Sequence, residues 1–405
     1  MLINNLILIA LASIITIDGI GIYNNQAGLI GAVFLVCFGI ILIRDIKISQ
    51  TLKLLFFLFF ILTLISDCLS TNLANSVKFT LIYTASFFAF AYANINKDYL
   101  SKFVVPLIFI LSIFLSLYST VLPILIKQDG FLLPSSGYQL IYPTFGSHNH
   151  LGDFLLLSLV ACFYFLFTKS FSKHSQNYKQ VIICLLIFFF LPYFIFSYSR
   201  SSYVSLSLTL IIMSIFLIKK NLNKKSLTVF GLIAITLVLS SIFLLSVSDI
   251  KDESIFKNVK TNLHTTHNLS NKYPSGNRLA YFSQGLLSIT DKPLFGVGPG
   301  NFVYVSKKYK NPTDWWTETS HNIFLDVFVE NGLFAGLIFL FIILNLLINS
   351  KKNVFFFMAL ALLLDFQSDY TYRIHSIFLL FSILMGLAYE ARHLTKAKSD
   401  NIENI

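Results

Sequence analysis

Long apolar stretches separated by short polar segments run along most of the chain. An uncharged helix needs about 20 residues to cross about 30 Å of hydrocarbon. Twelve stretches come close to that length, so the pattern predicts an all-α polytopic membrane protein with about twelve transmembrane helices. They lie near residues 3–22, 27–43, 52–66, 77–93, 103–126, 151–168, 180–198, 201–218, 226–247, 332–348, 353–367 and 374–390.

The composition agrees with burial in lipid. Hydrophobic residues make up 56% of the 405 positions and charged residues only 12%, against about 25% charged residues in an ordinary soluble domain. The first stretch is expected to remain as a true span, because residues 1–5 carry no Lys or Arg and no small-residue cleavage site follows. The cysteines offer no metal-binding or disulfide spacing and are interpreted as small apolar residues.

Lysine and arginine recur in every second loop, which is the signature of cytoplasmic loops. Both termini are therefore predicted to be cytoplasmic. This topology gives nine transmembrane helices in residues 1–247, a large outer loop at 248–331, three more helices in 332–390 and a cytoplasmic tail at 391–405. The net charge of +11 follows from this bias and from the basic outer loop, so it indicates attraction to the lipid bilayer and no nucleic-acid partner.

The polar residues collect on one side of the predicted membrane. Residues 248–331 form the one long hydrophilic stretch, whereas a transporter distributes charged residues along its spans. Within this loop the spacing of four apolar residues predicts an amphipathic helix that starts at Arg278. These are Leu279, Phe282, Leu286 and Ile289. The glycine-rich run at 296–301 predicts a tight turn and a candidate anion nest, and Trp315 with Trp316 indicates an interfacial anchor.

A second helix is predicted after this turn. Thr319 and Ser320 offer a helix cap, and His321 opens a run whose apolar residues share a face until Asn331 and Gly332 interrupt it. A histidine at a helix N-terminus is kept neutral and lies where anions bind, which suits a base beside a phosphate.

One arginine lies where arginine is scarce. Arg200 stands between two apolar spans on the predicted outer side, so it is expected to reach the outer surface or an aqueous cavity. The alternative for Arg200 is a side chain that extends to the lipid headgroups.

Four segments together resemble a known family. They are SRSSY at 199–203, GNRLAYFSQGLLSITDKPLFGVGPGNF at 276–302, SHNIFLDVFVENGLFAGLIFL at 320–340 and FGSHNHLGDF at 145–154. The set resembles the O-antigen ligase and O-antigen polymerase superfamily of bacterial envelope glycan assembly, over about residues 140–350. The N-terminal third is similar only in hydropathy.

The resemblance implies a fold and a reaction. Such proteins resemble the multi-span glycosyltransferase (GT-C-like) fold, work without a cofactor or metal, and transfer a glycan with inversion from an undecaprenyl diphosphate carrier on the periplasmic side. The leaving diphosphate must be stabilised by a cation. Since the chain contains no DxD pair to hold a metal, permanently charged arginine is the natural substitute.

The resemblance also assigns residues. Arg200 and Arg278 are expected on the donor diphosphate, and His321 is expected to activate the acceptor hydroxyl or to steady the donor. Tyr281 stands where tryptophan is expected, and Ser201 follows Arg200 where glycine is common. Both departures weaken the subfamily assignment.

Several other polar residues are candidates for either a functional or a plain structural role. The secondary candidates are Asn322, Tyr281, and the histidines His148 and His150, which could line the donor entrance or merely lie at the end of a span. A metal site at His264 and His267 is disfavoured because their surroundings hold no acidic residue. A structural ion pair is favoured over catalysis for the polar set near the last outer loop, which consists of Asp365, Asp369, Arg373 and His375. A basic cluster could contact an anionic acceptor lipid or polysaccharide, or equally form a solvated face. It consists of Lys307, Lys308 and Lys310.

The leading hypothesis is an O-antigen ligase that uses a lipid A core oligosaccharide as acceptor. A polymerase, whose acceptor is another lipid-linked glycan, would have the same site. A protein-acceptor oligosaccharyltransferase is a third reading, disfavoured because no further domain follows the last span. The competing class is a lipid-linked sugar flippase or transporter, which should carry charged residues deep in several helices and short loops throughout.

Overall fold

The fold is all-helical in the part of the chain that the structure describes. The computed structural model describes residues 2–20, 29–33, 48–125, 144–145, 147–168, 176–197, 199–218, 278–311 and 316–390. The helices are α1 (Leu2–Ile20), α3 (Gln50–Cys68), α4 (Leu73–Ile95), α5 (Lys97–Leu125), α6 (His148–Phe167), α7 (Gln176–Phe196), α8 (Arg200–Ile218), α11 (Arg278–Ile289), α12 (Phe302–Tyr309), α13 (Ile323–Ile348), α14 (Val354–Asp365) and α15 (His375–Ala388). A single 3₁₀ turn, Thr371–Arg373, joins the last two helices.

Five of these helices are long and apolar enough to cross a membrane. They are the segments Gln50–Cys68, Lys97–Val121, Asn149–Phe167, Arg200–Leu217 and Ile323–Ile348. Shorter apolar helices match further predicted stretches, at Ile7–Ile20, Gln180–Phe196, Val354–Asp365 and His375–Ala388. The helical architecture is thus confirmed, while the number twelve stays a prediction. The predicted span at 226–247 and most of the one at 27–43 lie outside the described residues.

Short polar side chains start several of the apolar helices. Ser49 caps α3 by accepting a hydrogen bond from the Leu52 amide at 3.2 Å. Asn353 caps α14 in the same way, through the Phe356 amide at 3.0 Å. Each cap satisfies one of the amides that a helix leaves without a partner in its first turn.

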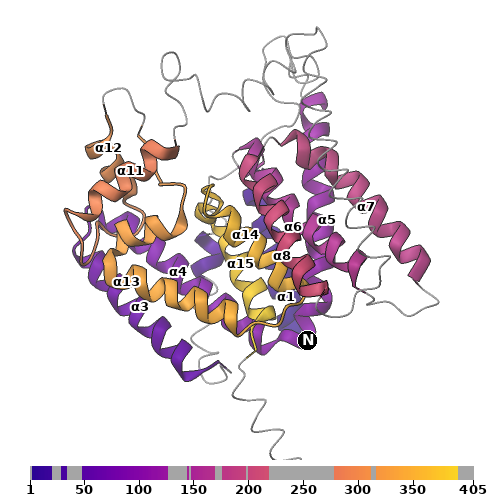
Figure 1. Cartoon of the computed structure of the whole chain (residues 1–405), viewed down its shortest axis with the longest axis horizontal. Coiled ribbons are helices and arrows are strands. Elements are labelled where there is room, and N and C mark those ends of the chain that lie inside the picture. Colours follow the sequence, from indigo (N-terminus) through magenta and orange to yellow (C-terminus); the bar gives the residue numbers. More distant parts are fainter. Residues whose placement is uncertain are drawn as a thin grey trace, which may run out of the picture.

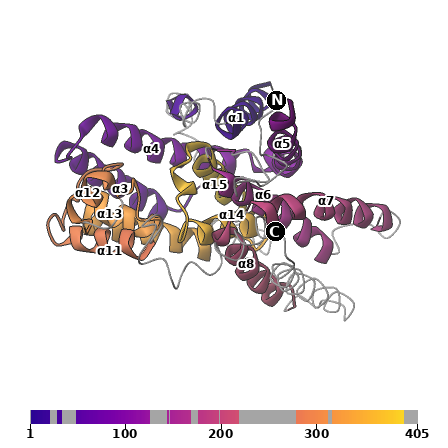
Figure 2. The same ribbon diagram turned by 90° about the horizontal axis from the view of Figure 1, so that it is seen from above.

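Helices α14 and α15 form the centre of the molecule. Figure 1 shows them between a group that contains α3, α4 and α13 and a group that contains α5, α6 and α8. Every residue of α15 is buried. The peripheral helices instead expose large apolar side chains, such as Phe57 on α3 at 60% and Phe188 on α7 at 78%. Figure 2 shows α7 reaching outward from the rest of the bundle. Exposed apolar stripes on long helices are expected to face lipid.

A kink in α13 receives the glycine-rich turn. The expected interruption before the span is confirmed, since Gly332 has φ 83° inside a helix that otherwise runs from residue 323 to residue 348. The Leu333 amide, freed by the kink, donates to the Pro293 carbonyl at 2.8 Å. On the other side of the turn, the Gly298 amide donates to the Glu330 carbonyl at 2.8 Å. A Cβ atom at Gly296 would lie 2.4 Å from that carbonyl oxygen, so only glycine allows this contact.

The glycine-rich turn binds an anion of the protein itself, the Glu330 carboxylate. The Phe302 amide donates to Oε1 of Glu330 at 3.2 Å, and the Gly300 amide also bonds this carboxylate. Arg373 donates to the same Oε1 at 2.6 Å and to Oδ2 of Asp326 at 2.7 Å. The structural ion pair predicted near Asp365, Asp369, Arg373 and His375 is therefore confirmed for Arg373, although its partners lie outside that set. Its partners come from α13, because the 3₁₀ turn packs its side chain against the kink and not back along its own loop.

Helix α11 begins at Arg278 as predicted, but the middle of its apolar stripe faces outward, and only Ile289 among its described members packs on a buried cluster. The side chains of Phe282 and Leu286 are 40% and 49% exposed. The buried face carries Tyr281, Gln284 and Ser288. Trp316, of the expected interfacial anchor, is also 47% exposed, whereas Trp315 lies outside the described residues. In a membrane protein the apolar side of a surface helix can face lipid while its polar side packs on the protein.

Candidate functional site

Four helix N-termini meet at one carboxylate. Asp369 lies in the loop between α14 and α15, and its Oδ2 accepts hydrogen bonds from Arg278 Nη2 at 3.1 Å and from Ser201 Oγ at 3.2 Å. Its Oδ1 lies 4.0 Å from His321 Nδ1 and 4.0 Å from His150 Nε2. These four residues belong to, or directly precede, the first turns of α11, α8, α13 and α6.

The arrangement favours negative charge. Asp369 is only 1% exposed, and each helix N-terminus contributes the positive end of its dipole. The ion pair with Arg278 compensates its charge directly, and the Tyr370 amide donates to Oδ1 at 2.7 Å. Asp369 itself occupies the position that the four helix ends favour for an anion, so an anionic ligand would depend on the arginines at this site.

His321 is held in a strained and nearly enclosed position. Its φ of 61° lies in the left-handed region that side chains rarely adopt, and its amide donates to Oγ1 of Thr319 at 3.0 Å. The imidazole is stacked on the Tyr281 ring, with centroids 5.6 Å apart, and meets the Tyr370 ring edge-on at 5.0 Å. Tyr281, one of the secondary candidates, is thus brought into the site.

Burial keeps the imidazole neutral. Desolvation lowers the pKa of His321 to about 4, and the nearby charge of Asp369 opposes this shift without reversing it. The sequence predicted a neutral histidine from the helix dipole, whereas here burial is the main cause. Because Nδ1 faces Asp369, Nε2 is the nitrogen left to take a proton from a ligand.

The helix cap is Asn322 and not Thr319 or Ser320. The Oδ1 of Asn322 accepts from the Leu325 amide at 3.0 Å, so the predicted cap at Thr319 or Ser320 is wrong. The left-handed conformation of His321 turns the chain, which places Asn322 at the start of the helix. The Asn322 side-chain amide also donates to the Gln367 carbonyl at 3.2 Å. This secondary candidate therefore connects α13 to the loop that carries Asp369.

Arg200 and Arg278 present two positive charges to the same region. Arg200 is the exposed first residue of α8, and the side chain of Arg278 is 41% exposed. The two charges interact electrostatically. Within the described residues, no hydrogen bond or ion pair of the Arg200 guanidinium is found. Two neighbouring guanidinium groups, one of them without a carboxylate, form a natural binding site for a phosphate-bearing ligand.

His150 belongs to this site from its buried side. It is 1% exposed, its Nδ1 contacts the Phe145 carbonyl at 2.9 Å, and its ring meets Tyr370 edge-on at 4.7 Å. A side chain so enclosed does not line an open donor entrance. His148 is the first residue of α6, and its side chain lies outside what the structure describes.

Sequence reasoning missed Asp369 as the centre of the site. The sequence places it among four polar residues near the last predicted outer loop, a set that favours a structural ion pair over catalysis. The structure separates that set, since Arg373 pairs with Asp326 and Glu330 while Asp369 pairs with Arg278. Nothing in the local sequence distinguishes Asp369 from Asp365, four residues earlier.

Three buried side chains of the site have the chemistry of metal ligands. Ligand atoms of His150, Asp153 and Asp369 all lie within 4.8 Å of one another. Among the residues that the structure describes, His150 Nε2 and Asp153 Oδ2 have no hydrogen-bond partner. Imidazole and carboxylate groups in this number could hold a divalent cation. The other histidine pair, His264 and His267, lies outside the described residues.

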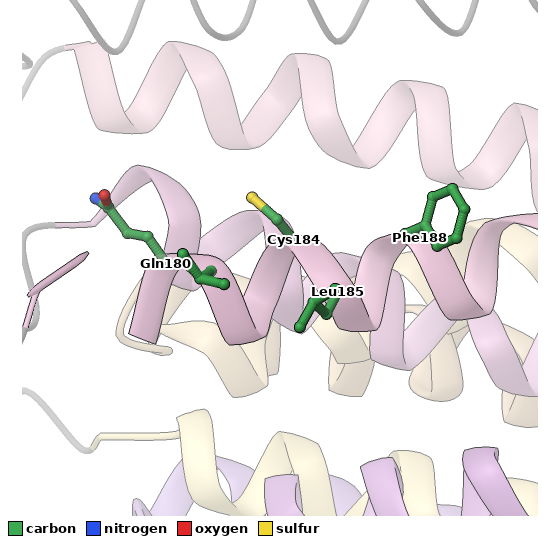
Figure 3. Close-up of a pocket in the computed structure, with 5 residues that line it drawn as sticks. Gln180, Cys184, Leu185 and Phe188 are labelled. Carbon is green, nitrogen blue, oxygen red and sulfur yellow. The ribbon is translucent and has the colours of Figure 1, made fainter. Parts of the chain in front are cut away.

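The basic residues of α12 are engaged elsewhere. Lys308 forms an exposed ion pair with Asp291, and the Lys307 ammonium lies 4.7 Å from the centroid of the Trp316 ring. A hollow on the outer side of α7, shown in Figure 3, is lined by Gln180, Val181, Cys184, Leu185 and Phe188. It contains no charged group, so it lacks the means to bind a diphosphate.

Comparison with known proteins identifies the central part of the chain. The family model described as O-antigen ligase matches residues 182–340. The matched region contains Arg200, Arg278 and His321, and it leaves out Asp369 and the segment 145–154. The resemblance to the O-antigen ligase and polymerase superfamily is thereby confirmed. No curated protein matches the chain.

Proposed function

Because the chain carries an O-antigen ligase family domain, we propose that it transfers a lipid-linked glycan at a membrane. In this proposal the donor is an oligo- or polysaccharide on undecaprenyl diphosphate, and the acceptor is a lipid A core oligosaccharide. The reaction inverts the anomeric centre and needs no metal. The protein lies in the bacterial inner membrane, with both termini cytoplasmic and the site at the periplasmic face.

One observation carries the proposal. The charge of Arg278 acts both on Arg200 and on His321, a histidine that burial keeps neutral. Arginine offers bidentate hydrogen bonds to phosphate oxygens, and a neutral imidazole can accept a proton. A diphosphate on the arginines would bring the sugar carbon to which it is bonded towards the imidazole.

Each residue then has one role in the transfer. His321 Nε2 takes the proton of an acceptor hydroxyl while the hydroxyl oxygen forms a bond to the anomeric carbon of the donor. The bond between that carbon and the phosphate oxygen breaks on the opposite face, and its electron pair leaves with undecaprenyl diphosphate. Arg200 and Arg278 stabilise the charge that develops on this leaving group.

Asp369 supports this chemistry through the other ring nitrogen of His321, Nδ1. The Asp369 carboxylate favours the His321 tautomer that carries its proton on Nδ1 and leaves Nε2 free. It also stabilises the imidazolium that forms. The 4.0 Å between His321 Nδ1 and Asp369 Oδ1 exceeds a direct hydrogen bond. Such contacts commonly shorten when substrate binds.

The position of the site suits a lipid-linked donor. All four helix ends that meet at Asp369 are predicted to be outer ends, at the level of the headgroups. A diphosphate bound there leaves its polyprenyl chain in the hydrocarbon and its glycan in the aqueous phase. A transporter would instead need a polar path through the bilayer.

The test is glycan transfer by purified, reconstituted variants. Arg278→Ala should lose most activity, and His321→Ala should slow transfer by about 10²- to 10⁴-fold, the usual contribution of a general base. Lys308→Ala removes an exposed cation from the same loop and should leave activity unchanged. If Arg278→Ala and His321→Ala both insert and both transfer glycan at the wild-type rate, the proposal is wrong.

A lipid gel of a deletion strain separates the ligase from the polymerase. Loss of a ligase leaves finished polymer on the carrier, which is the result we expect. Accumulation of single lipid-linked repeat units would identify a polymerase working through the same residues.

A further inference from the structure

The serines on both sides of Arg200 are buried although the arginine is exposed. Ser199, Ser201 and Ser202 are 0%, 2% and 0% exposed, respectively. Hydroxyl groups removed from water need hydrogen-bond partners, since an unpaired buried polar group is costly. The partners of these three serines therefore show what surrounds Arg200 on its protein side.

The three hydroxyls connect two buried carboxylates. Ser199 donates to Oδ1 of Asp153 at 2.6 Å, and Ser202 donates to the same oxygen. Ser199 also lies 3.0 Å from the hydroxyl of Ser201, which donates to Oδ2 of Asp369 at 3.2 Å. Because Arg278 donates to that Oδ2 as well, polar contacts link α6, past Arg200, to the other arginine. The contact between Ser199 and Ser201 is a close approach of two oxygens, since each hydroxyl donates its one proton to a carboxylate.

The network also fixes the backbone that carries Arg200. The Ser202 amide donates to the Ser199 hydroxyl at 3.3 Å, which places Ser199 as a cap on the first turn of α8. Next to Asp153, a Cβ atom at Gly152 would lie 2.2 Å from Ser197 Oγ. The turn before Arg200 thus packs directly on α6, with no room for adjustment.

Electrostatic attraction does not explain why Arg200 lies near Arg278. Its charge and that of Arg278 repel each other, and within the described residues no carboxylate pairs with it. Some other interaction must hold the backbone that carries Arg200 close to Arg278 until an anion binds. The serine hydroxyls and the two carboxylates supply such an interaction at the first turn of α8, and Asp153 acts through the serines.

We propose that Asp153, Ser199, Ser201 and Ser202 form a positioning network that holds Arg200 opposite Arg278, so that both arginines reach the same diphosphate. This inference rests on the proposed function, because it assumes that the ligand between the arginines is a diphosphate. It assigns roles to residues that surround the two arginines and that do not themselves react.

Binding of undecaprenyl diphosphate to the full-length protein in nanodiscs tests the network. Asp153→Ala should weaken binding by about 10-fold or more, the effect of misplacing one charge-assisted contact. Asp153→Asn keeps an oxygen that accepts from Ser199 and Ser202, so it should restore most of the affinity. Ser158→Ala, another buried hydroxyl of α6, removes only a hydrogen bond to Ser112 and should bind normally.

A double-mutant cycle separates positioning from a general structural effect. In an Arg200→Ala background, Asp153→Ala should cause no further loss, because the network acts through the arginine. Independent, additive losses would overturn the inference, as would an Asp153→Asn variant as defective as Asp153→Ala. Transfer kinetics should show a raised KM for the donor and an unchanged KM for the acceptor.

The two hypotheses can fail separately. A wild-type protein that binds undecaprenyl diphosphate but transfers no glycan would refute the proposed function and leave the binding cycle valid. A wild-type protein that does not bind the diphosphate at all would refute the network as stated. Normal transfer and normal diphosphate binding by Asp153→Ala would refute the network alone.

Discussion

The enclosure of His321 predicts an unusual tolerance of acid. Its pKa is lowered from 6.5 to about 4, chiefly by burial. At pH 5 a group with a pKa of about 4 is about 0.9 neutral, whereas one with a pKa of 6.5 is about 0.03 neutral. The imidazole acts as a base only when neutral, so its enclosure raises the active fraction at pH 5 by about 30-fold.

The profile of kcat/KM against pH measures this fraction, because it reports the free enzyme. With reconstituted protein and subsaturating donor, kcat/KM should stay level from pH 8 to about pH 5 and then fall as His321 takes up a proton. The sign follows from the lowered pKa: the neutral base persists above it and is lost below it. The His321→Ala variant should lack this step and show only a low, flat residual rate.

Substitutions of two neighbouring aromatic residues test how burial sets the pKa of His321, one as the perturbation and the other as its control. Tyr281 is stacked on the His321 ring, so Tyr281→Ala should admit water and move the pKa of His321 back towards 6.5. Activity at pH 5 should then fall by up to about 30-fold relative to pH 8. Phe282 is the next residue on α11 but is 40% exposed, so Phe282→Ala should leave the profile unchanged. A wild-type midpoint near pH 6.5, or equal profiles for wild type and Tyr281→Ala, would refute the reasoning.

Further predictions concern stability and metal. Arg373→Met leaves Asp326 and Glu330 as uncompensated buried charges, so it should cost about 3–5 kcal/mol and lower the melting temperature in detergent; an unchanged melting temperature would contradict this. Gly332→Ala places a Cβ about 2.1 Å from the Leu294 carbonyl at a φ of 83°, so the yield of folded protein should drop. Chelation with EDTA should not reduce transfer. A loss restored by Mg²⁺ or Mn²⁺ would mean that the chemistry requires a metal.

Local features of the chain were predictable where one short segment determines them. The start of α11 at Arg278 follows from apolar spacing, and the break in α13 at Gly332 follows from a glycine that tolerates positive φ. Arg200 could be named as a candidate because it lies where the topology makes cations rare, and Arg278 and His321 because each lies at the start of a predicted helix in a segment that resembles the family. That information lies in the order of residues along the chain.

Contacts between distant segments were not predictable in this way. Asp369 and Arg278 are 91 positions apart, and Arg373 finds Asp326 at a separation of 47. Several carboxylates lie at comparable distances along the chain, and only packing of the helices selects among them. The outward face of α11 has a related cause. Periodicity locates an apolar stripe, but it does not distinguish a protein core from lipid.

The neighbouring charges of Arg200 and Arg278 have a consequence for turnover. On leaving the glycan, the carrier diphosphate exchanges an ester oxygen for an ionisable one, so its negative charge increases. Two guanidinium groups therefore bind the by-product more tightly than the donor that delivered it. We expect competitive inhibition by undecaprenyl diphosphate and a rate limited by its departure. A cell that depends on this transfer would need a phosphatase that consumes the spent carrier as fast as it forms.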